Sequence, residues 1–260
     1  MKLFFMKVIA QFNIDSLKIN NGFNLNNINL NIYENQINTI IGKNGSGKST
    51  LLSIMTKYLK PKKNQLIIEQ KDILDINYKK LSKLVSIAPQ INNIYEDMLV
   101  YDYLELSRSP YANFLGFLNK EDKNKILEIA KTLKIEHLLY KKFNELSGGE
   151  RQKIVLSSCL IQDTKIIIMD EPLTFLDLKN QLEIIELIQD LKNKYNKTII
   201  LVLHELEFAF NISDFISIMD NGTIVLSDKP INVLTNQNMK NYFNIDANFK
   251  LVDKKNKLIY

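Results

Sequence analysis

The 260-residue sequence is poor in several features that mark particular protein classes. Its single cysteine, Cys159, cannot form an internal disulfide, and no charged-then-apolar signal segment opens the chain, so we expect a reducing cytoplasm. Only 5 prolines accompany 45% hydrophobic residues, which excludes a disordered or fibrous chain. The longest apolar runs are well short of the roughly 20 residues that a bilayer span requires, so we expect no membrane-crossing segment.

The excess of one sign of charge over the other is also small. Lys and Arg number 34 against 29 Asp and Glu, and the resulting net charge of +5 is spread along the chain. This balance favours solubility or contact with an anionic membrane surface, and we expect no nucleic-acid partner. Arg108 and Arg151 are the two arginines in a chain whose other basic residues are Lys. An arginine kept against this preference for Lys indicates a need for the planar guanidinium group.

Glycine is concentrated in two places. Of the 8 glycines, five lie in two short clusters, Gly42, Gly45 and Gly47 in the first and Gly148 and Gly149 in the second. Glycine lets the backbone approach another group closely, so both clusters are candidate binding segments.

Hydrophobic spacing predicts an α/β fold with a parallel sheet. Residues 5–41 alternate apolar and polar side chains, as antiparallel strands do, whereas residues 91–143 carry apolar residues three and four apart, as helices do. Strands and helices alternate elsewhere. The other predicted strands are residues 37–41, 65–68, 84–88, 166–169 and 198–203. One predicted helix begins at Lys48 and is stopped by Pro61, and two others span residues 150–161 and 177–195.

We interpret residues 1–260 as one domain with three parts. Residues 1–90 and 144–230 form a core with an N-terminal antiparallel β subdomain, residues 91–143 form an inserted α-helical subdomain, and residues 231–260 form a C-terminal extension. Asn221-Gly222 predicts a hairpin, followed by short helices. The pattern of residues 231–260 predicts only that they are folded.

Residues 42–49 fit G-x-x-x-x-G-K-[ST] between a predicted strand and a predicted helix, which is the context of a P-loop. Backbone N–H groups at a helix N-terminus favour an anion. We expect Lys48 to reach the β- and γ-phosphates of a nucleotide and the Ser49 hydroxyl to ligate Mg²⁺. The expected nucleotide-binding residues of this P-loop NTPase (RecA-like) core are Gly42, Lys43, Asn44, Gly45, Ser46, Gly47, Lys48, Ser49 and Thr50.

Two acids end a strongly apolar strand, in the sequence Ile-Ile-Ile-Met-Asp170-Glu171. Such a strand would place both carboxylates at the carboxyl edge of the sheet, where open α/β sheets bind ligands. We expect Asp170 to hold Mg²⁺ and Glu171 to act as the general base toward the attacking water. Carboxylates that end a core strand are often only solvated, so this pattern alone is a weak indication of a site, and the P-loop makes it a strong one.

The segment Leu146-Ser147-Gly148-Gly149-Glu150 lies 24 residues before Asp170 (170 − 146). Together with the P-loop and the acidic strand it resembles the ATP-binding cassette (ABC) ATPases, whose signature reads LSGGE or LSGGQ. The resemblance covers nearly the whole chain in the family's order. It implies that the protein binds and hydrolyses ATP with Mg²⁺.

The resemblance implies roles for three further residues. Gln90 is similar to the family's Q-loop glutamine, which contacts Mg²⁺ and the attacking water. Asp177 resembles the D-loop aspartate at the dimer contact. His204 resembles the switch histidine that contacts the γ-phosphate. His137 has no such counterpart, and we expect a surface or packing position for it.

In this family the signature of one subunit closes over the nucleotide held by the P-loop of the other, so the resemblance implies a homodimer on ATP binding. Ser147 and the N–H of Gly149 would donate to the γ-phosphate across that interface, with Gly148 and Glu150 completing the contact. The family also stacks an aromatic residue on adenine before the P-loop strand. The aligned position here is Asn21, and Phe23 is expected to take its place.

The segment Ser107-Arg108-Ser109-Pro110 is similar to the Gly-Arg-x-Pro segment of importer ATPases for ferric siderophores, haem and cobalamin, with Ser107 in the glycine position. The resemblance implies a peripheral subunit on the cytoplasmic side of the membrane, with integral-membrane permease subunits and an extracellular substrate-binding protein as partners. Arg108 would contact the permease or form a salt bridge within the insert. Alternatives are an importer of another cargo and a soluble ABC ATPase acting on ribosomes or DNA.

Overall fold

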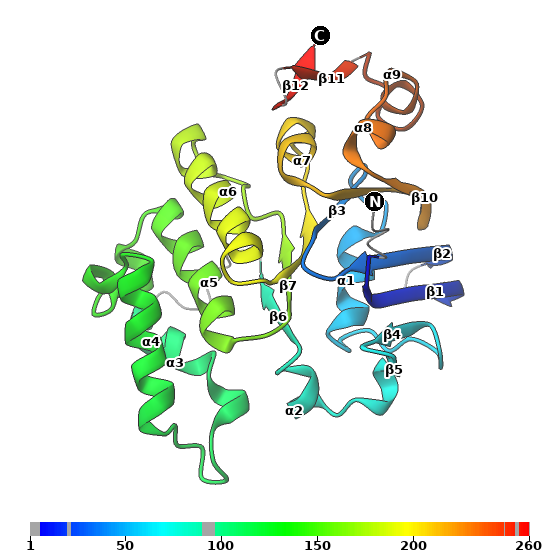
Figure 1. The fold of residues 1–260 in the computed structure, drawn as a ribbon. Coiled ribbons are helices and arrows are strands. Elements are labelled where there is room, and N and C mark those ends of the chain that lie inside the picture. The colour runs from blue at the N-terminus through cyan, green and yellow to red at the C-terminus, as the bar shows by residue number, and fades with distance from the viewer. Residues whose placement is uncertain (1–5, 20–21, 90–96, 247, 253–254, 260) are drawn as a thin grey trace, which may run out of the picture. The chain divides into compact units, whose positions relative to one another are not determined.

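The computed structural model describes residues 6–19, 22–89, 97–246, 248–252 and 255–259. The chain forms two compact units, one made of Met1–Asn77 with Lys192–Tyr260 and the other of Tyr78–Leu191 (Figure 1). Helices and strands alternate through both units, so the predicted α/β class is confirmed.

An antiparallel sheet opens the first unit, as the alternation over residues 5–41 predicted. Its strand order is β2-β1-β4-β5, with β1 at Val8–Lys18, β2 at Asn24–Tyr33, β4 at Leu66–Ile68 and β5 at Lys71–Asp72. Apolar side chains such as Phe12 and Leu30, which lie opposite each other across the β1–β2 pair, are buried. This regular burial of one face fixes the register of the pair.

The first unit also carries parallel strands. In its sheet β3 (Ile37–Ile41) pairs in parallel with β8 (Thr198–Val202) and with β9 (Phe215–Asp220), and β10 (Thr223–Asp228) runs antiparallel to β9. All residues of β3 and β8 are buried, as expected for strands covered on both faces. The expected hairpin is confirmed, because Asn221 and Gly222 have φ values of 44° and 78° between β9 and β10.

The first helix ends earlier than the sequence predicted. Helix α1 spans Lys48–Met55, whereas we expected it to continue until Pro61. Lys57 has a φ of 59° and its N–H donates to the carbonyl of Ile54. A left-handed residue of this kind closes a helix without proline, and such an ending leaves little trace in the sequence.

The C-terminal part of the first unit contains more than the expected short helices. Helix α7 (Leu206–Ile212) precedes β9, and α8 (Pro230–Val233), α9 (Asn236–Asn238) and a π-helix at Met239–Phe243 follow β10. A strand pair, β11 (Asn248–Val252) with β12 (Lys255–Ile259), comes last and was not predicted, because residues 231–260 show no clear alternation.

The second unit combines two parallel strands with the main helices. Strand β6 (Val85–Ala88) pairs with β7 (Ile166–Asp170), both as predicted. Its helices are α2 (Tyr78–Leu81), α3 (Val100–Leu106), α4 (Lys120–Thr132), α5 (Gly148–Gln162) and α6 (Leu178–Asn193), whose last two residues fall in the first unit. Within the described part of the chain, no helix is long and apolar enough to cross a membrane.

Helix α5 forms much of the core of the second unit. Its residues Ile154 to Ile161 are all buried, including Cys159. Burial raises the pKa of the Cys159 thiol to about 12, so the thiol stays protonated and unreactive at neutral pH. The single cysteine is therefore a packing residue.

Candidate functional site

The P-loop follows β3 and leads into α1, as predicted. Gly45 and Gly47 have φ values of 77° and 108°, which glycine adopts without strain. Gly47 is the N-cap of α1, and neither a side-chain cap nor an acidic residue occupies the first turn. The N-terminal amide groups of the helix are therefore not satisfied by side chains and carry no competing negative charge, as an anion site requires.

Lys48 lies folded across this loop. Its side chain is buried, and its Nζ donates to the carbonyl oxygens of Gly42 at 2.9 Å and Lys43 at 3.1 Å. These bonds hold the ammonium group at the mouth of the loop, while Ser49 at the start of α1 is exposed. A positive charge and a hydroxyl thus flank the amide groups that would receive phosphate.

Two of the three P-loop glycines, Gly42 and Gly47, are packed so tightly that a larger residue would displace their neighbours. A Cβ on Gly42 would lie 2.2 Å from the carbonyl oxygen of Met219, and one on Gly47 would lie 2.8 Å from the ring of Phe23. Phe23, which we expected to stack on adenine, is half-buried against the P-loop. The alternative stacking position, Asn21, lies outside the described residues.

If Phe23 stacks on the base, Phe23→Ala should weaken ATP affinity about 2- to 10-fold, because an aromatic pair contributes roughly 0.5–1.5 kcal/mol. Phe23→Tyr should retain the affinity. Equilibrium binding of a fluorescent ATP analogue measures both variants. An unchanged affinity for Phe23→Ala would exclude this role.

The tip of the β9–β10 hairpin is hydrogen-bonded to the P-loop, a contact that sequence analysis missed. The N–H of Gly222 donates to the carbonyl of Ser46 at 2.9 Å, and the carbonyl of Gly222 accepts the N–H of Asn26 at 2.9 Å. A Cβ on Gly222 would lie only 2.1 Å from the carbonyl oxygen of Asn24. Glycine is therefore required at this tip for both its backbone angle and its close approach.

Gly222→Ala is expected to lower the free energy of unfolding by roughly 2 kcal/mol or more and to weaken ATP binding, because the clash displaces the donor to Ser46. Gly116→Ala is the matched control: Gly116 has a φ of 84°, but nothing lies within 4 Å of its Cβ position. Thermal unfolding with and without ATP tests the pair. Equal midpoints for the two variants would show that the contact is unimportant.

His204 and the P-loop follow neighbouring strands of the first unit. Strands β3 and β8 are parallel, with Ile40 opposite Val202, so their carboxyl ends share one edge of the sheet. The P-loop leaves this edge from β3, and the exposed His204 follows β8 two residues after its end. The described geometry thus brings these two predicted elements to one edge, as open α/β sheets do with ligand-binding groups.

In the second unit, β7 ends at Asp170 and the chain turns at Glu171. Asp170 is half-buried, with a buried Oδ1, and Glu171 has a φ of 52°. A non-glycine residue in this region is strained, and such strain concentrates at functional positions. Thr174 donates from Oγ1 to the Glu171 carboxylate at 3.4 Å. Gln90, predicted to work with these acids, lies outside the described residues.

The signature segment forms the N-terminus of α5. The helix begins at Gly148, two residues before the predicted start, because Ser147 caps it: the Ser147 Oγ accepts the N–H of Glu150, whose carboxylate in turn accepts the N–H of Ser147. Ser147 and Gly148 are exposed, and Gly149 is buried. The signature therefore presents its serine to solvent from a fixed helix end.

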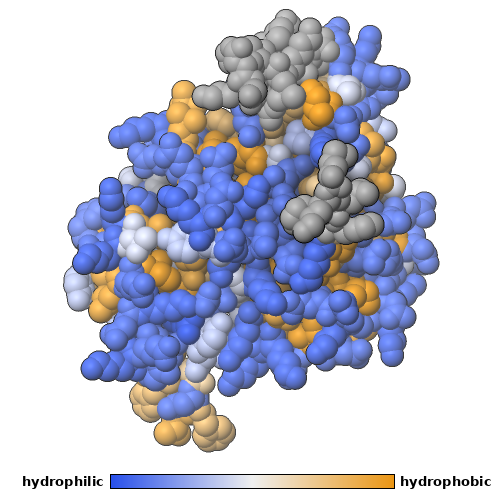
Figure 2. Space-filling model, viewed as in Figure 1, coloured by the Kyte–Doolittle hydropathy of each residue, from blue (hydrophilic) through white to orange (hydrophobic). Residues whose placement is uncertain are grey.

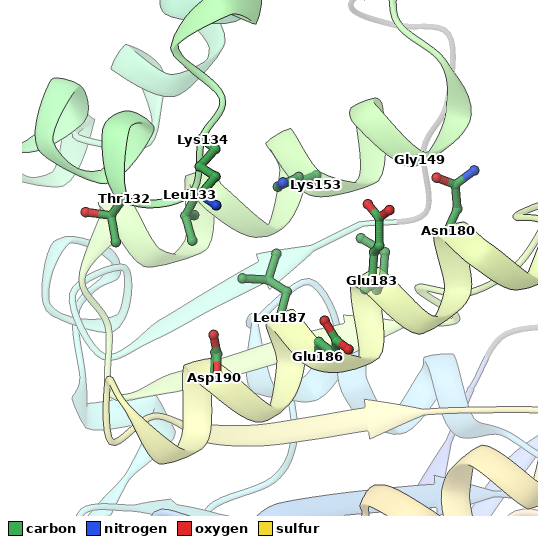
Figure 3. A pocket seen from close by; sticks show the side chains of 11 residues that line it. Thr132, Leu133, Lys134, Gly149, Lys153, Asn180, Glu183, Glu186, Leu187 and Asp190 are labelled. Carbon is green, nitrogen blue, oxygen red and sulfur yellow. The ribbon is translucent and has the colours of Figure 1, made fainter.

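The segment after Glu171 packs on the signature glycines. A Cβ on Gly149 would lie 2.3 Å from Oδ1 of Asn180, and Figure 3 shows the Asn180 side chain beside Gly149 at the ends of α6 and α5. Asp177, the predicted dimer-contact residue, caps α6 by accepting the N–H of Asn180 at 2.8 Å. Asn180 is a further residue that sequence analysis missed.

Two pockets adjoin this contact within the second unit. One, of about 150 Å³, is lined by residues of the signature helix and of the turn after β7: Gly148, Arg151, Gln152, Glu171, Thr174, Phe175 and Leu176. The other, of about 340 Å³, lies between α6, with Glu183, Glu186 and Asp190, and the side chains of Lys134 and Lys153 (Figure 3). The first pocket places Glu171 and the signature helix on a common surface.

Arg108 is an internal residue. It is buried, donates from Nε to Asp122 at 2.9 Å and from Nη1 to the carbonyl of Ile161 at 2.9 Å, and stacks with its guanidinium carbon 3.7 Å from the centre of the Tyr111 ring. The salt bridge within the insert is thus the alternative that the structure supports. Breaking such a pair destabilises the fold by roughly 3–5 kcal/mol. A loss of permease binding in Arg108→Ala would therefore not distinguish a lost contact from a destabilised fold.

Two further expectations concern His137 and the metal site. His137 is exposed, as expected for a residue without a site role. Among the described residues, no group of three or more His, Cys, Asp or Glu side chains is arranged to hold a metal ion.

Comparison with known proteins identifies the family. The family described as ABC transporter matches residues 25–174, from β2 to the turn after Glu171. The chain belongs to the ABC transporter family. It is therefore an ABC-type ATPase, and membership of a transporter family supports the transport interpretation over a role on ribosomes or DNA.

Relatives and solved structures agree with this membership. A petrobactin import ATP-binding protein of Bacillus anthracis is 33% identical over 86% of this chain and 83% of its own length. A chain from an ABC transporter in an inward-facing conformation covers 98% of both chains with a TM-score of 0.82 at 21% identity, which supports the predicted P-loop NTPase fold. An ATP-binding cassette solved as a dimer with ADP and Pi covers 85% of this chain and 98% of its own, with a TM-score of 0.70 and 26% identity.

Proposed function

We propose that the chain is the ATPase subunit of an importer for ferric siderophores or the related ligands haem and cobalamin. The observation that carries this proposal is the ordered set of P-loop, signature, acidic strand end and His204, combined with the Ser107–Pro110 segment and a relative named for petrobactin import. The subunit would lie on the cytoplasmic side of the membrane, with a permease pair and an extracellular substrate-binding protein.

ATP is the substrate of the proposed site. Backbone N–H groups of the P-loop and Lys48 bind its phosphates, Glu171 takes a proton from the attacking water, and His204 contacts the γ-phosphate. Ser49 and Asp170, with Gln90, offer the hard oxygen ligands that Mg²⁺ prefers, and the metal would neutralise phosphate charge. The uncapped helix end at Gly47 supports the phosphate assignment.

The working form is proposed to be a homodimer in which each signature meets the nucleotide held by the other subunit. Exposed groups beside the signature support this arrangement. Ser147 and Gly148 face solvent, and Phe175 and Leu178 in the segment around Asp177 are 95% and 65% exposed. Large apolar side chains so exposed beside a functional segment are typical of an interface.

The inserted segment offers a surface for the permease. A pocket of about 470 Å³ lies between α3, α4 and the loop that joins them, and Leu106, Phe114, Leu115 and Phe117 around it are all more than half exposed. This loop forms the lower end of the second unit in the view of Figure 1, and Figure 2 shows an apolar projection there. Exposed apolar patches of this kind mark protein contacts.

The experiment that tests the function is uptake of a ferric siderophore by cells that lack the chain. We expect the wild-type protein to restore uptake and to copurify with a polytopic permease. Phe114→Ser with Leu115→Ser should reduce that copurification at least about tenfold, because apolar anchors dominate interfaces, while isolated ATPase activity stays unchanged. The control is Tyr140→Ser, an 80% exposed aromatic residue elsewhere in the same unit. Full uptake without the chain would refute the import role.

A further inference from the structure

The signature hydroxyl is already engaged within its own chain. Ser147 Oγ donates to Oε2 of Glu150 at 2.7 Å, and the same Oε2 accepts the Ser147 N–H at 2.8 Å. The Glu150 N–H donates to Ser147 Oγ at 3.3 Å. Three hydrogen bonds therefore form a closed ring between these two residues.

The acceptor in this ring is a charged group. The Ser147 N–H, and then its hydroxyl, lower the pKa of Glu150, so its carboxylate is ionised at neutral pH. Glu150 is half-buried, whereas Ser147 and Gly148 are exposed. A full negative charge thus lies one hydrogen bond behind the surface that would meet a phosphate.

The hydroxyl of Ser147 has one proton and can donate it to one acceptor at a time. We propose that Glu150 competes with the γ-phosphate for this proton, so that Glu150 raises the ATP concentration needed to close the dimer. On closure the hydroxyl turns to donate to the phosphate, and Glu150 keeps its hydrogen bond from the Ser147 N–H. This inference rests on the proposed function, in which Ser147 meets the nucleotide of the partner subunit.

Glu150→Gln tests the competition, because the amide oxygen still accepts the Ser147 N–H but carries no charge. We expect the ATP concentration for half-maximal dimerisation to fall roughly 3- to 10-fold, because a neutral amide oxygen accepts the Ser147 hydroxyl less strongly than an ionised carboxylate does. The KM for ATP should fall with little change in kcat. The difference should shrink in high salt, which screens exposed charges.

The matched control is Glu145→Gln. Glu145 Oε2 accepts the Lys142 N–H at 2.7 Å in the same kind of turn, five residues earlier, and within the described part of the chain it accepts no hydrogen bond from a hydroxyl. We expect its ATP threshold to equal that of the wild type. Equal falls for both variants would overturn the competition in favour of a general charge effect, and so would an unchanged or raised threshold for Glu150→Gln.

Ser147→Ala separates this inference from the proposed function. The dimerisation thresholds of all variants are compared by light scattering in the Glu171→Gln background, KM and kcat are measured in chains that keep Glu171, and unfolding midpoints check folding. If ATP produces no dimer in the parent, the proposed function fails. If Ser147→Ala weakens the dimer but Glu150→Gln does not strengthen it, the composite site stands and the competition is overturned.

Discussion

Glu171→Gln is expected to lower ATP turnover at least about 100-fold while leaving ATP binding intact, because it removes the general base but keeps the shape of the side chain. With turnover blocked, the protein should accumulate as an ATP-bound dimer. Phosphate release and size-exclusion chromatography in ATP or ADP measure the two effects.

Glu183→Gln provides the control for Glu171→Gln. Glu183 is an exposed carboxylate on α6, outside the proposed site, and its replacement should leave turnover unchanged. Wild-type turnover in Glu171→Gln would remove Glu171 from the catalytic role.

Mixing two inactive variants is expected to restore activity. Lys48→Ala removes the phosphate-binding ammonium, and Ser147→Arg blocks the signature, so each variant alone should lose nearly all turnover. In a mixed dimer, one of the two composite sites contains both native residues. With random pairing of equal amounts, about a quarter of wild-type activity should return, as two-fold symmetry requires.

The control mixture combines Lys48→Ala with Glu171→Gln. Both residues belong to the same chain's share of a site, so every site in the mixed dimer would carry one defect and no activity should return. Recovery in this control, or none in the first mixture together with a protein that stays single-copy in ATP, would exclude the composite site.

Local patterns predicted most of the fold. Alternation predicted the β1–β2 pair, apolar runs predicted β3 and β8, and the Asn221-Gly222 dipeptide predicted the hairpin. These features depend on neighbouring residues, whose spacing is visible in the sequence. The end of α1 was missed because Lys57, a residue with no turn preference of note, adopts the left-handed conformation.

The candidate site was predicted by residue type and order, but not by its supporting contacts. Nothing local signals that Asn180 lies on Gly149, that Gly222 donates to Ser46, or that Arg108 pairs with Asp122 on α4. Each contact joins segments whose pairing follows from the fold as a whole. Spacing alone could not have revealed them.

The contact between Gly222 and Ser46 has a consequence for the smallest piece of this polypeptide that can hold a nucleotide. A fragment ending where the family match ends, at residue 174, would contain all the phosphate-binding amides. It would lack the hairpin whose N–H holds the Ser46 carbonyl in place and whose Met219 carbonyl packs on Gly42. Retaining ATP therefore demands that trimming from the C-terminal side stop beyond Asp228.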